Sequence, residues 1–430
     1  MPTIDLGSIR SLFPDAKEWV IALSGGLDSS VLLHALHGLP DRPDIRVVHV
    51  NHQLSAFSSQ WQQHAEQQCA KLDVAIKSVA VNVRHSGRGI EAAARKARYS
   101  VFSAELGPRS VLMLGHHEND QAETVLLRLL RGAGPRGLSA MPLCRPLGEG
   151  CLYRPLLSFP REELLRYAQA NGLEWVEDDS NSDPSFDRNY LRNQVLPLIE
   201  ARWQGYSRNW AHSSRALREA VEILDERAEN DLNELDTQNE VFGISVAAGK
   251  LSGLSQARQN NVLPVLMKKY RFSAMPRAQM EQLLHVLLPA QPAAQPKVEW
   301  AGHHACRFAG RVFFLFRLPD LDWESIKVVP VSSGGGMFSA QLPGMCELSV
   351  ELNSKVPVSS KITIRMRRGG ERLSTGEGKR KSLKNWFQEN AFPPWLRDRV
   401  PLLFIGEDLV AVGDAWHCER RVRAIQLQWC

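Results

Sequence analysis

The sequence predicts an α/β fold for the first half of the chain, with a parallel sheet and helices on both faces, followed by a helical domain and a small α+β C-terminal domain. Short apolar runs alternate with helical stretches up to about residue 176, helical periodicity continues to about residue 286, and hairpin-like alternation follows a serine and glycine run at 332–336. Because 430 residues suffice for about three domains, we place them at 1–202, 203–330 and 331–430.

The first domain is predicted as a series of βαβ units. Strands are expected at 19–23, 45–50, 74–79 and 111–114, and helices at 29–37, 59–72, 90–106 and 120–130. Ligands of such sheets bind beyond the carboxyl ends of the strands. Polar residues that directly follow each strand are therefore the first candidates for a functional site.

The later elements follow from a change of pattern. Residues 203–286 carry helical periodicity with almost no strand-like runs, and three prolines within 288–297 indicate a linker or an exposed loop. Alternation at 346–352 and 361–366, and at 402–412 around a turn at 406–408, predicts hairpins in a small mixed domain.

Composition excludes several classes of protein. A chain with 43% apolar and 23% charged residues is globular, and its net charge of +5 is too small to identify a partner. No run approaches the roughly 18 apolar residues of a membrane span, and the start does not resemble a signal peptide, so we expect a cytoplasmic protein without membrane contact. Seven scattered cysteines without a C-x-x-C pair argue against a zinc site, a disulfide framework or a thiol relay. No pattern indicates an oligomer.

The first candidate site is a phosphate-binding loop directly after the first strand. It consists of Ser24, Gly25, Gly26, Leu27, Asp28, Ser29 and Ser30. Glycines let backbone amides approach an anion, the following helix presents its positive end, and serine hydroxyls can donate to phosphate oxygens. The loop lacks the lysine of G-x-x-x-x-G-K-[ST] but has Asp28, a suitable Mg²⁺ ligand. The alternative is an ordinary helix cap that binds nothing.

The second candidate site follows the fourth strand, at residues 115–124. Asp120 and Glu123 are three residues apart, so they share one face of a helix at the same sheet edge as the loop, where they could hold a cation such as Mg²⁺ or an amine. His116 is a further catalytic candidate in this run. Otherwise these residues only cap a helix.

Arg95 lies on a predicted helix and is a candidate for binding a triphosphate, since the loop itself has no lysine. Arg131 belongs to a glycine-rich basic loop, and Arg188 and Arg192 lie in a long polar run. These positions are expected to contact nucleotide or RNA. Alternatively, Arg95 lies on a solvated helix face with salt bridges, and the polar run is a turn-rich loop between domains.

The third candidate site is a basic segment. Residues 361–384 hold nine basic and two acidic side chains, a surplus of +7 that exceeds the net charge of the chain. With Trp386 and Phe387 beside it, this segment predicts a loop-borne RNA-binding patch with aromatic support, although a solvated strand face would give the same pattern. The predicted RNA-binding residues are Arg365, Arg367, Arg368, Arg372, Lys379, Arg380, Lys381 and Lys384.

The loop at 24–30 resembles the pyrophosphate-binding loop (PP-loop) of the ATP-pyrophosphatase superfamily, whose domain has the adenine nucleotide alpha hydrolase-like fold. Together with the motifs at 90–99, 116–124, 131–137 and 177–192, in this order, it resembles the long, three-domain members of the tRNA(Ile)-lysidine synthetase family.

That resemblance implies that ATP, with Mg²⁺, adenylates the C2 carbonyl of the wobble cytidine in a tRNA(Ile) with a CAU anticodon. Free L-lysine then displaces AMP to give lysidine, and decoding changes from AUG to AUA. Asp120 and Glu123 would bind the lysine, and the C-terminal domain would grip the acceptor region. Another PP-loop tRNA-modifying enzyme or a non-catalytic tRNA-binding protein stays open as an alternative.

Overall fold

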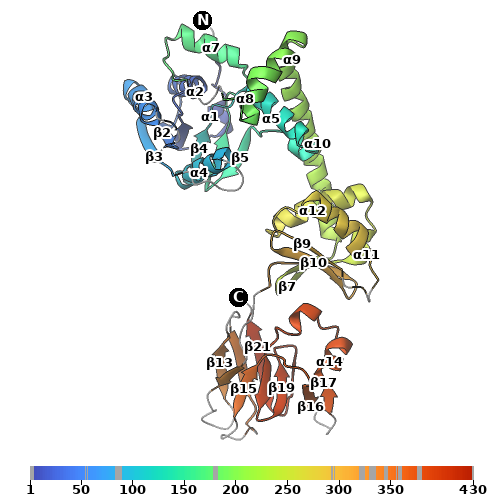
Figure 1. Cartoon of the computed structure of the whole chain (residues 1–430). Helices are drawn as coiled ribbons and strands as arrows, with labels where there is room; N and C mark the ends of the chain where they lie inside the picture. Colours follow the sequence, from blue (N-terminus) through green and yellow to red (C-terminus); the bar gives the residue numbers. More distant parts are fainter. Residues whose placement is uncertain are drawn as a thin grey trace. The chain divides into compact units, whose positions relative to one another are not determined.

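The computed structural model describes residues 4–53, 55, 57–82, 90–177, 183–291, 294, 296–318, 325–328, 336–342, 347–354, 356, 361–374 and 380–428. The chain forms two compact units, Met1–Ile223 and Leu224–Cys430. Figure 1 shows the helices and strands of both units.

The first unit is built on a six-stranded sheet with the order β3-β2-β1-β4-β6-β5. All neighbours in it are parallel except the β5–β6 hairpin. The strands are β1 (Glu18–Ala22), β2 (Asp44–Asn51), β3 (Ala75–Ala80), β4 (Ser110–Met113), β5 (Cys144–Leu147) and β6 (Gly150–Tyr153). The four predicted strands are confirmed. The short strands β5 and β6 were not predicted, because they contain arginine, proline and glycine and so do not form an apolar run.

Helices cover both faces of this sheet, as predicted. Along β1, Ile21 packs with side chains of α2, α3 and α7, while Val20 packs with Phe102 of α4 on the opposite face. The helices are α1 (Ile9–Leu12), α2 (Leu27–His37), α3 (Ser58–Lys71), α4 (Ile90–Ala104), α5 (Glu118–Leu130), α6 (Pro135–Leu138), α7 (Arg161–Ala170), α8 (Asp187–Tyr190), the π-helix η2 (Leu191–Val195), α9 (Leu196–Arg202) and α10 (Tyr206–Glu234). The last of these continues into the second unit.

The second unit begins with a helical region that also contains a five-stranded sheet of order β7-β8-β11-β10-β9. Its elements are β7 (Gln238–Glu240), β8 (Gly243–Ala247), α11 (Ala248–Ser252), α12 (Gln256–Lys269), α13 (Arg277–Gln282), the π-helix η3 (Leu283–Leu287), β9 (Lys297–Trp300), β10 (His303–Phe308) and β11 (Arg311–Leu315). The expectation that strands are almost absent before residue 286 was wrong at β7 and β8. Because β8 pairs with the distant β11, local periodicity could not reveal it.

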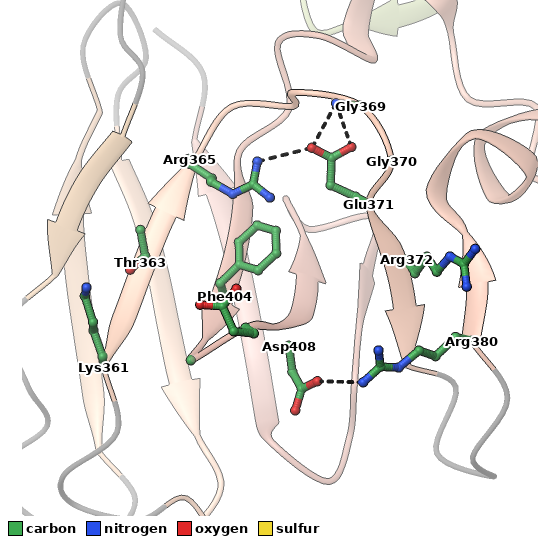
Figure 2. A pocket seen from close by; sticks show the side chains of 12 residues that line it. Lys361, Thr363, Arg365, Gly369, Gly370, Glu371, Arg372, Arg380, Phe404 and Asp408 are labelled. Atoms are coloured by element: carbon green, nitrogen blue, oxygen red, sulfur yellow. Dashed lines mark hydrogen bonds and ion pairs between the residues drawn. The ribbon is translucent and has the colours of Figure 1, made fainter.

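The rest of the second unit is mostly β structure. It comprises β12 (Ser325–Val328), β13 (Met337–Gln341), β14 (Glu347–Leu352), β15 (Ile362–Arg365), β16 (Arg372–Ser374), β17 (Arg380–Ser382), α14 (Leu383–Glu389), η4 (Pro394–Leu396), β18 (Leu402–Ile405), β19 (Asp408–Val412), β20 (Trp416–His417) and β21 (Val422–Gln428). The hairpin predicted around 406–408 is confirmed as β18–β19. Strands β15, β16 and β18 border the pocket drawn in Figure 2.

The domain boundaries at 202/203 and 330/331 stay predictions. The first coincides with the end of α9, the compact units divide later, inside α10, and the second boundary and most of the 332–336 run lie outside the described residues. None of the helices in the described part of the chain combines the length and the apolar content that a membrane crossing needs.

Gly150 is required where β6 meets β4. A Cβ atom there would lie 2.4 Å from the carbonyl oxygen of Ser110 and 3.0 Å from that of Gly107. We expect Gly150→Ala to lower the free energy of unfolding of the first unit by about 1–3 kcal/mol in chemical denaturation. Gly38→Ala is the control, since its Cβ would meet nothing closer than 3.6 Å. Equal stability of the two variants would contradict the prediction.

Candidate active site

The phosphate loop is shaped by its own hydroxyl groups. Ser29 Oγ accepts from the amide of Ser24 at 3.2 Å, and the hydroxyls of Ser29 and Ser30 donate to the carbonyl of Gly26 at 3.1 and 3.0 Å. Gly25 has φ +87°, which favours glycine, and Gly26 caps α2. The buried serines Ser29 and Ser30 therefore hold the loop in its conformation. We predict that the backbone amides at the start of α2 contact the phosphate.

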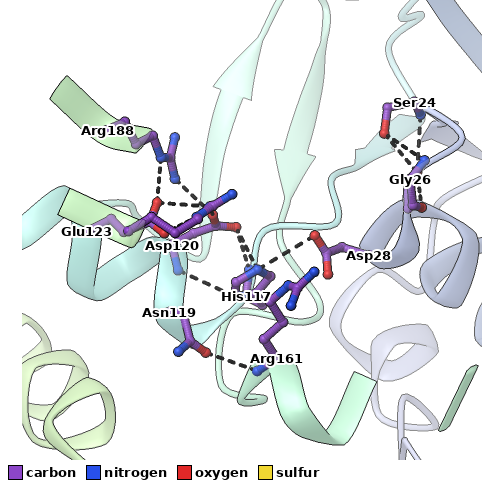
Figure 3. A network of polar contacts seen from close by, with 11 residues as sticks. Ser24, Gly26, Asp28, His117, Asn119, Asp120, Glu123, Arg161 and Arg188 are labelled. Atoms are coloured by element: carbon purple, nitrogen blue, oxygen red, sulfur yellow. Dashed lines mark hydrogen bonds and ion pairs between the residues drawn. The ribbon is translucent and has the colours of Figure 1, made fainter. Parts of the chain in front are cut away.

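Asp28 lies in the first turn of α2 and faces the next motif (Figure 3). Its Oδ2 is 3.6 Å from His117 Nε2, whereas its buried Oδ1 has no hydrogen-bond partner in the described part of the chain. Burial raises the pKa of Asp28, and the nearby Asp120 acts in the same direction against the opposing effect of His117. An unpaired carboxylate oxygen beside a phosphate loop suits a bound cation.

His117, which we did not single out from the sequence, is the histidine that connects the two motifs. It is 1% exposed and caps α5. Its Nδ1 accepts a hydrogen bond from the backbone amide of Asp120 at 3.4 Å, and the backbone amide of His117 donates to Asp120 Oδ2 at 3.1 Å. Since Nδ1 accepts, Nε2 carries the proton and faces the carboxylates of Asp28 and Asp120, each at 3.6 Å. A capping box with Asp at the third helical position was the available signal.

His116, the predicted catalytic histidine, is an uncharged group. Burial lowers its pKa to about 3, and Arg154, Arg188 and Arg98 add to this effect while Asp120 opposes it. Its Nδ1 is buried without a hydrogen-bond partner among the described residues. Burial and the missing hydrogen bond both keep this imidazole neutral.

Asp120 and Glu123 form an ion-pair network with Arg188, shown in Figure 3, and with Arg192. Arg188 binds Glu123 Oε2 at 2.6 Å and Asp120 Oδ1 at 2.9 Å, and Arg192 binds Glu123 Oε1 at 2.5 Å and Asp120 Oδ1 at 3.0 Å. Burial alone would raise the pKa of Asp120, but His117 and Arg188 hold it well below its usual range. Residues that we assigned to two different ligands are thus neighbours that neutralise one another.

Other polar residues of α5 anchor the helix. Glu118 accepts from the hydroxyl of Ser207 on α10 at 2.6 Å, Asn119 accepts from the amide of Arg161 at 3.0 Å, and Gln121 exchanges two hydrogen bonds with the backbone of Met141. These three polar residues after β4 do not contact Asp28, and their role is to hold α5 in place.

The remaining predicted residues of the first unit lie at its surface. Arg95 reaches Tyr99 on its own helix, with its guanidinium 5.0 Å from the ring centre. Arg131 forms an exposed ion pair with Asp187 at 3.0 Å. Neither contact involves the phosphate loop.

The basic C-terminal residues are spread over strands, turns and α14 instead of one loop. Arg365, Arg372 and Arg380 line the pocket of about 440 Å³ shown in Figure 2. Arg365 is stacked on Phe404 at 4.1 Å and paired with Glu371, Arg380 faces Asp408 at 3.8 Å, and Arg372 is exposed.

The other predicted RNA-binding residues of this segment lie outside that lining. Arg367 pairs with Asp398 at 3.0 Å, Lys381 contacts Glu389, and Arg368 donates its amide to Glu371. Lys384 is exposed on α14, and Lys379 lies outside the described residues. Phe387 is fully buried in a core cluster with Trp386 packed against it, and the guanidinium of Arg367 lies 5.7 Å from its ring centre. The expected aromatic support stays a prediction.

A parallel sheet with a glycine-rich loop and a carboxylate at its carboxyl edge defines an ATP-binding domain of the PP-loop class. Residues 6–199 match the family model described as "PP-loop domain", residues 247–313 the "TilS substrate binding domain", and residues 362–429 the "TilS substrate C-terminal domain".

Curated relatives match nearly the whole chain. The tRNA(Ile)-lysidine synthase of Coxiella burnetii (strain RSA 493 / Nine Mile phase I) is 38% identical, with 94% of this chain and 90% of the relative covered. The synthases of Pseudomonas fluorescens (strain Pf0-1) and Legionella pneumophila (strain Paris) are 39% and 37% identical, covering 96% and 92% of this chain and 93% and 90% of the relatives.

The chain belongs to the tRNA(Ile)-lysidine synthase family, which confirms the resemblance found in the sequence. It is therefore an ATP-using, tRNA-modifying ligase built on a PP-loop domain.

Arg192 is expected to stabilise the first unit through Glu123, whose side chain is 2% exposed. Arg192→Gln leaves this carboxylate partly unpaired, so we expect the free energy of unfolding to fall by about 2–4 kcal/mol in chemical denaturation. Arg131→Gln, which breaks only the exposed pair with Asp187, should cost at most about 0.5 kcal/mol. Similar losses in both variants would show that burial of the network contributes nothing.

Proposed function

We propose that this chain ligates free L-lysine to C2 of the wobble cytidine of tRNA(Ile) with a CAU anticodon. The cytidine is first adenylated by ATP with release of pyrophosphate, and lysine then displaces AMP. The observation that carries this proposal is the placement of His117 between Asp28 and Asp120. Asp28 Oδ1 is unpaired among the described residues, and Asp120 shares its arginine partners with Glu123.

The adenylation half of the site is the loop from Ser24 to Ser30. The amides at the start of α2 would bind the pyrophosphate part of ATP, and Arg95 would supply a further positive charge to the triphosphate. Asp28 would hold Mg²⁺, which neutralises charge on the phosphate oxygens, and substrate oxygens would complete its coordination. The raised pKa and the unpaired oxygen of Asp28 support this role, because a cation removes both penalties.

The lysine half of the site is the carboxylate pair. A lysine ammonium would replace one guanidinium contact on Asp120 or Glu123, since Arg188 and Arg192 already hold both carboxylates in position. The arginine released in this exchange can then contact the RNA, which was its predicted role. His116, which is neutral because burial lowers its pKa, would help to orient the substrate.

The tRNA would be held by basic residues outside this centre. Arg131 lies on the exposed loop after α5, and Arg365, Arg372 and Arg380 converge on the pocket of the second unit. Arg367, Arg368, Lys379, Lys381 and Lys384 extend the same basic segment. Phosphate contacts of this kind set affinity and orientation without reading the base sequence. On the family resemblance, we assign the C-terminal region to the acceptor part of the tRNA.

The decisive experiment measures pyrophosphate release from ATP and incorporation of radiolabelled lysine, using a tRNA(Ile) transcript with a CAU anticodon and bulk tRNA. Transcript-dependent release together with lysine in the RNA supports the proposal. Release without lysine incorporation indicates another nucleophile, hence a different PP-loop tRNA modification. No release with intact tRNA binding indicates a non-catalytic binding protein and overturns the proposal.

Asp28→Asn should reduce pyrophosphate release by about 100-fold or more at saturating ATP, because Mg²⁺ loses its carboxylate ligand. The wild-type pKa is raised, so ionised Asp28 destabilises the ligand-free fold above that pKa. The variant should accordingly melt at a higher temperature than wild type at pH 7.5 without Mg²⁺. An unchanged Mg²⁺ dependence in Asp28→Asn would contradict this assignment.

Glu123→Gln should raise the KM for lysine by about tenfold or more, since a neutral amide binds an ammonium group less strongly. Pyrophosphate release in the absence of lysine should persist, because adenylation precedes lysine attack. Glu149→Gln, an exposed change at the amino edge of the sheet, serves as the control with the same loss of charge. The lysine assignment fails if both variants have the wild-type KM.

A further inference from the structure

A cluster of arginines surrounds Tyr99 next to the candidate active site. Tyr99 projects from α4, and the guanidinium groups of Arg95 and Arg145 lie 5.0 and 5.1 Å from the centre of its ring. Arg154 is the third member and is only 2% exposed. Its Nη1 donates to the carbonyl of Pro142 at 2.6 Å, while its buried Nε has no hydrogen-bond partner in the described part of the chain.

The groups that act on this cluster are mostly other cations. Burial lowers the pKa of Arg154, the Tyr99 hydroxyl opposes this, and Arg145 and Arg95 lower the pKa further. Burial would raise the pKa of Tyr99, yet that pKa is lowered because Arg95, Arg154 and Arg98 are close. A buried guanidinium without a carboxylate partner is unfavourable unless an anion compensates it. The cluster thus has the properties of an anion site.

The sheet places this cluster at the edge that carries the candidate active site. Strand β6 is parallel to β4, so Arg154, which follows β6, leaves the sheet beside His116, which follows β4. Arg145 is opposite Leu152 in the antiparallel β5–β6 pair and so joins Arg154 at this edge. In the strand order, β6 is two positions from β1, which separates the cluster from the phosphate loop by roughly 10 Å.

We propose that Arg145 and Arg154 bind a phosphodiester group of the tRNA next to the wobble nucleotide. This inference rests on the proposed function, because it requires RNA to enter the site. A nucleotide brought to His116 carries a phosphate on each side, and these phosphates need positive partners there. The phosphates of ATP have the backbone amides of the loop after β1, so Arg145 on β5 and Arg154 after β6 are left for RNA.

The chemistry of the pair suits a phosphodiester. A guanidinium presents a planar set of donors that matches two phosphate oxygens. Packing against Tyr99 fixes Arg145, and the carbonyl of Pro142 fixes one end of Arg154, whose buried Nε has no partner among the described residues. Both donors are held before the RNA arrives, which reduces the ordering that binding requires.

The test uses the full-length protein and measures binding without turnover. An anticodon stem-loop RNA with CAU is titrated at several salt concentrations, and ATP is titrated separately. Arg145→Gln should weaken RNA binding on the order of tenfold. It should also reduce the slope of log affinity against log salt by about 0.7–0.9, and leave ATP affinity unchanged. Arg145 is only partly buried, so this variant is expected to fold, which its melting temperature verifies.

Two further variants complete the design. Arg154→Lys keeps the buried charge but loses the planar donor set, so RNA binding should weaken less than in Arg145→Gln. Arg109→Gln is the matched control, because this exposed arginine precedes β4 at the opposite edge of the sheet. It should bind RNA as the wild type does.

Two outcomes would overturn the inference. Unchanged RNA affinity with weakened ATP binding in Arg145→Gln would assign the cluster to the phosphates of ATP, and unchanged affinity for both would show that the cluster binds no phosphate. Neither outcome affects the proposed function, which fails only if the wild-type enzyme incorporates no lysine into the transcript.

Discussion

The candidate site depends on the ion pairs between α5 and the α8–η2 segment. Asp120 and Glu123 are almost inaccessible to water, and two carboxylates this close and this deeply buried would repel one another without their arginine partners. Arg188 and Arg192 cancel that charge and join two segments that are more than sixty residues apart in the chain. The orientation of α5, and with it the placement of His116 and His117, follows from this network and from the anchors to Ser207, Met141 and Arg161.

Charge is distributed unevenly across the site. Carboxylates and arginines are paired on the α2 and α5 side, where Asp28 and Asp120 also face the same imidazole of His117. Arginines dominate on the side of α4 and the β5–β6 hairpin, around Tyr99. A reaction that joins a cationic amino acid to a polyanionic RNA with the help of a nucleotide needs both kinds of surface at one sheet edge. The parallel topology supplies them, because every strand end contributes a loop to that edge.

Local sequence was sufficient where one segment carries the whole signal. The loop at 24–30 needs only its strand, its glycines and its helix, and the structure places them in that order. The hairpin of β5 and β6 carries no such local signal, since its strands have four residues each and owe their stability to pairing with β4. Arg145 and Arg154 were missed for that reason. His117 was passed over because its importance arises from two carboxylates on different helices.

The sequence by itself determined the class of fold, the order of the motifs and the kind of chemistry, because glycine positions, helix caps and apolar periodicity act over a few residues. Only the tertiary structure decided the partners of the charged side chains. Asp120 and Glu123 meet Arg188 and Arg192, and Arg154 is buried with its Nε unpaired in the described part of the chain. The physical reason is that the strength of an ionic contact depends on burial and on distance through space, and neither quantity is encoded in the spacing of residues along the chain.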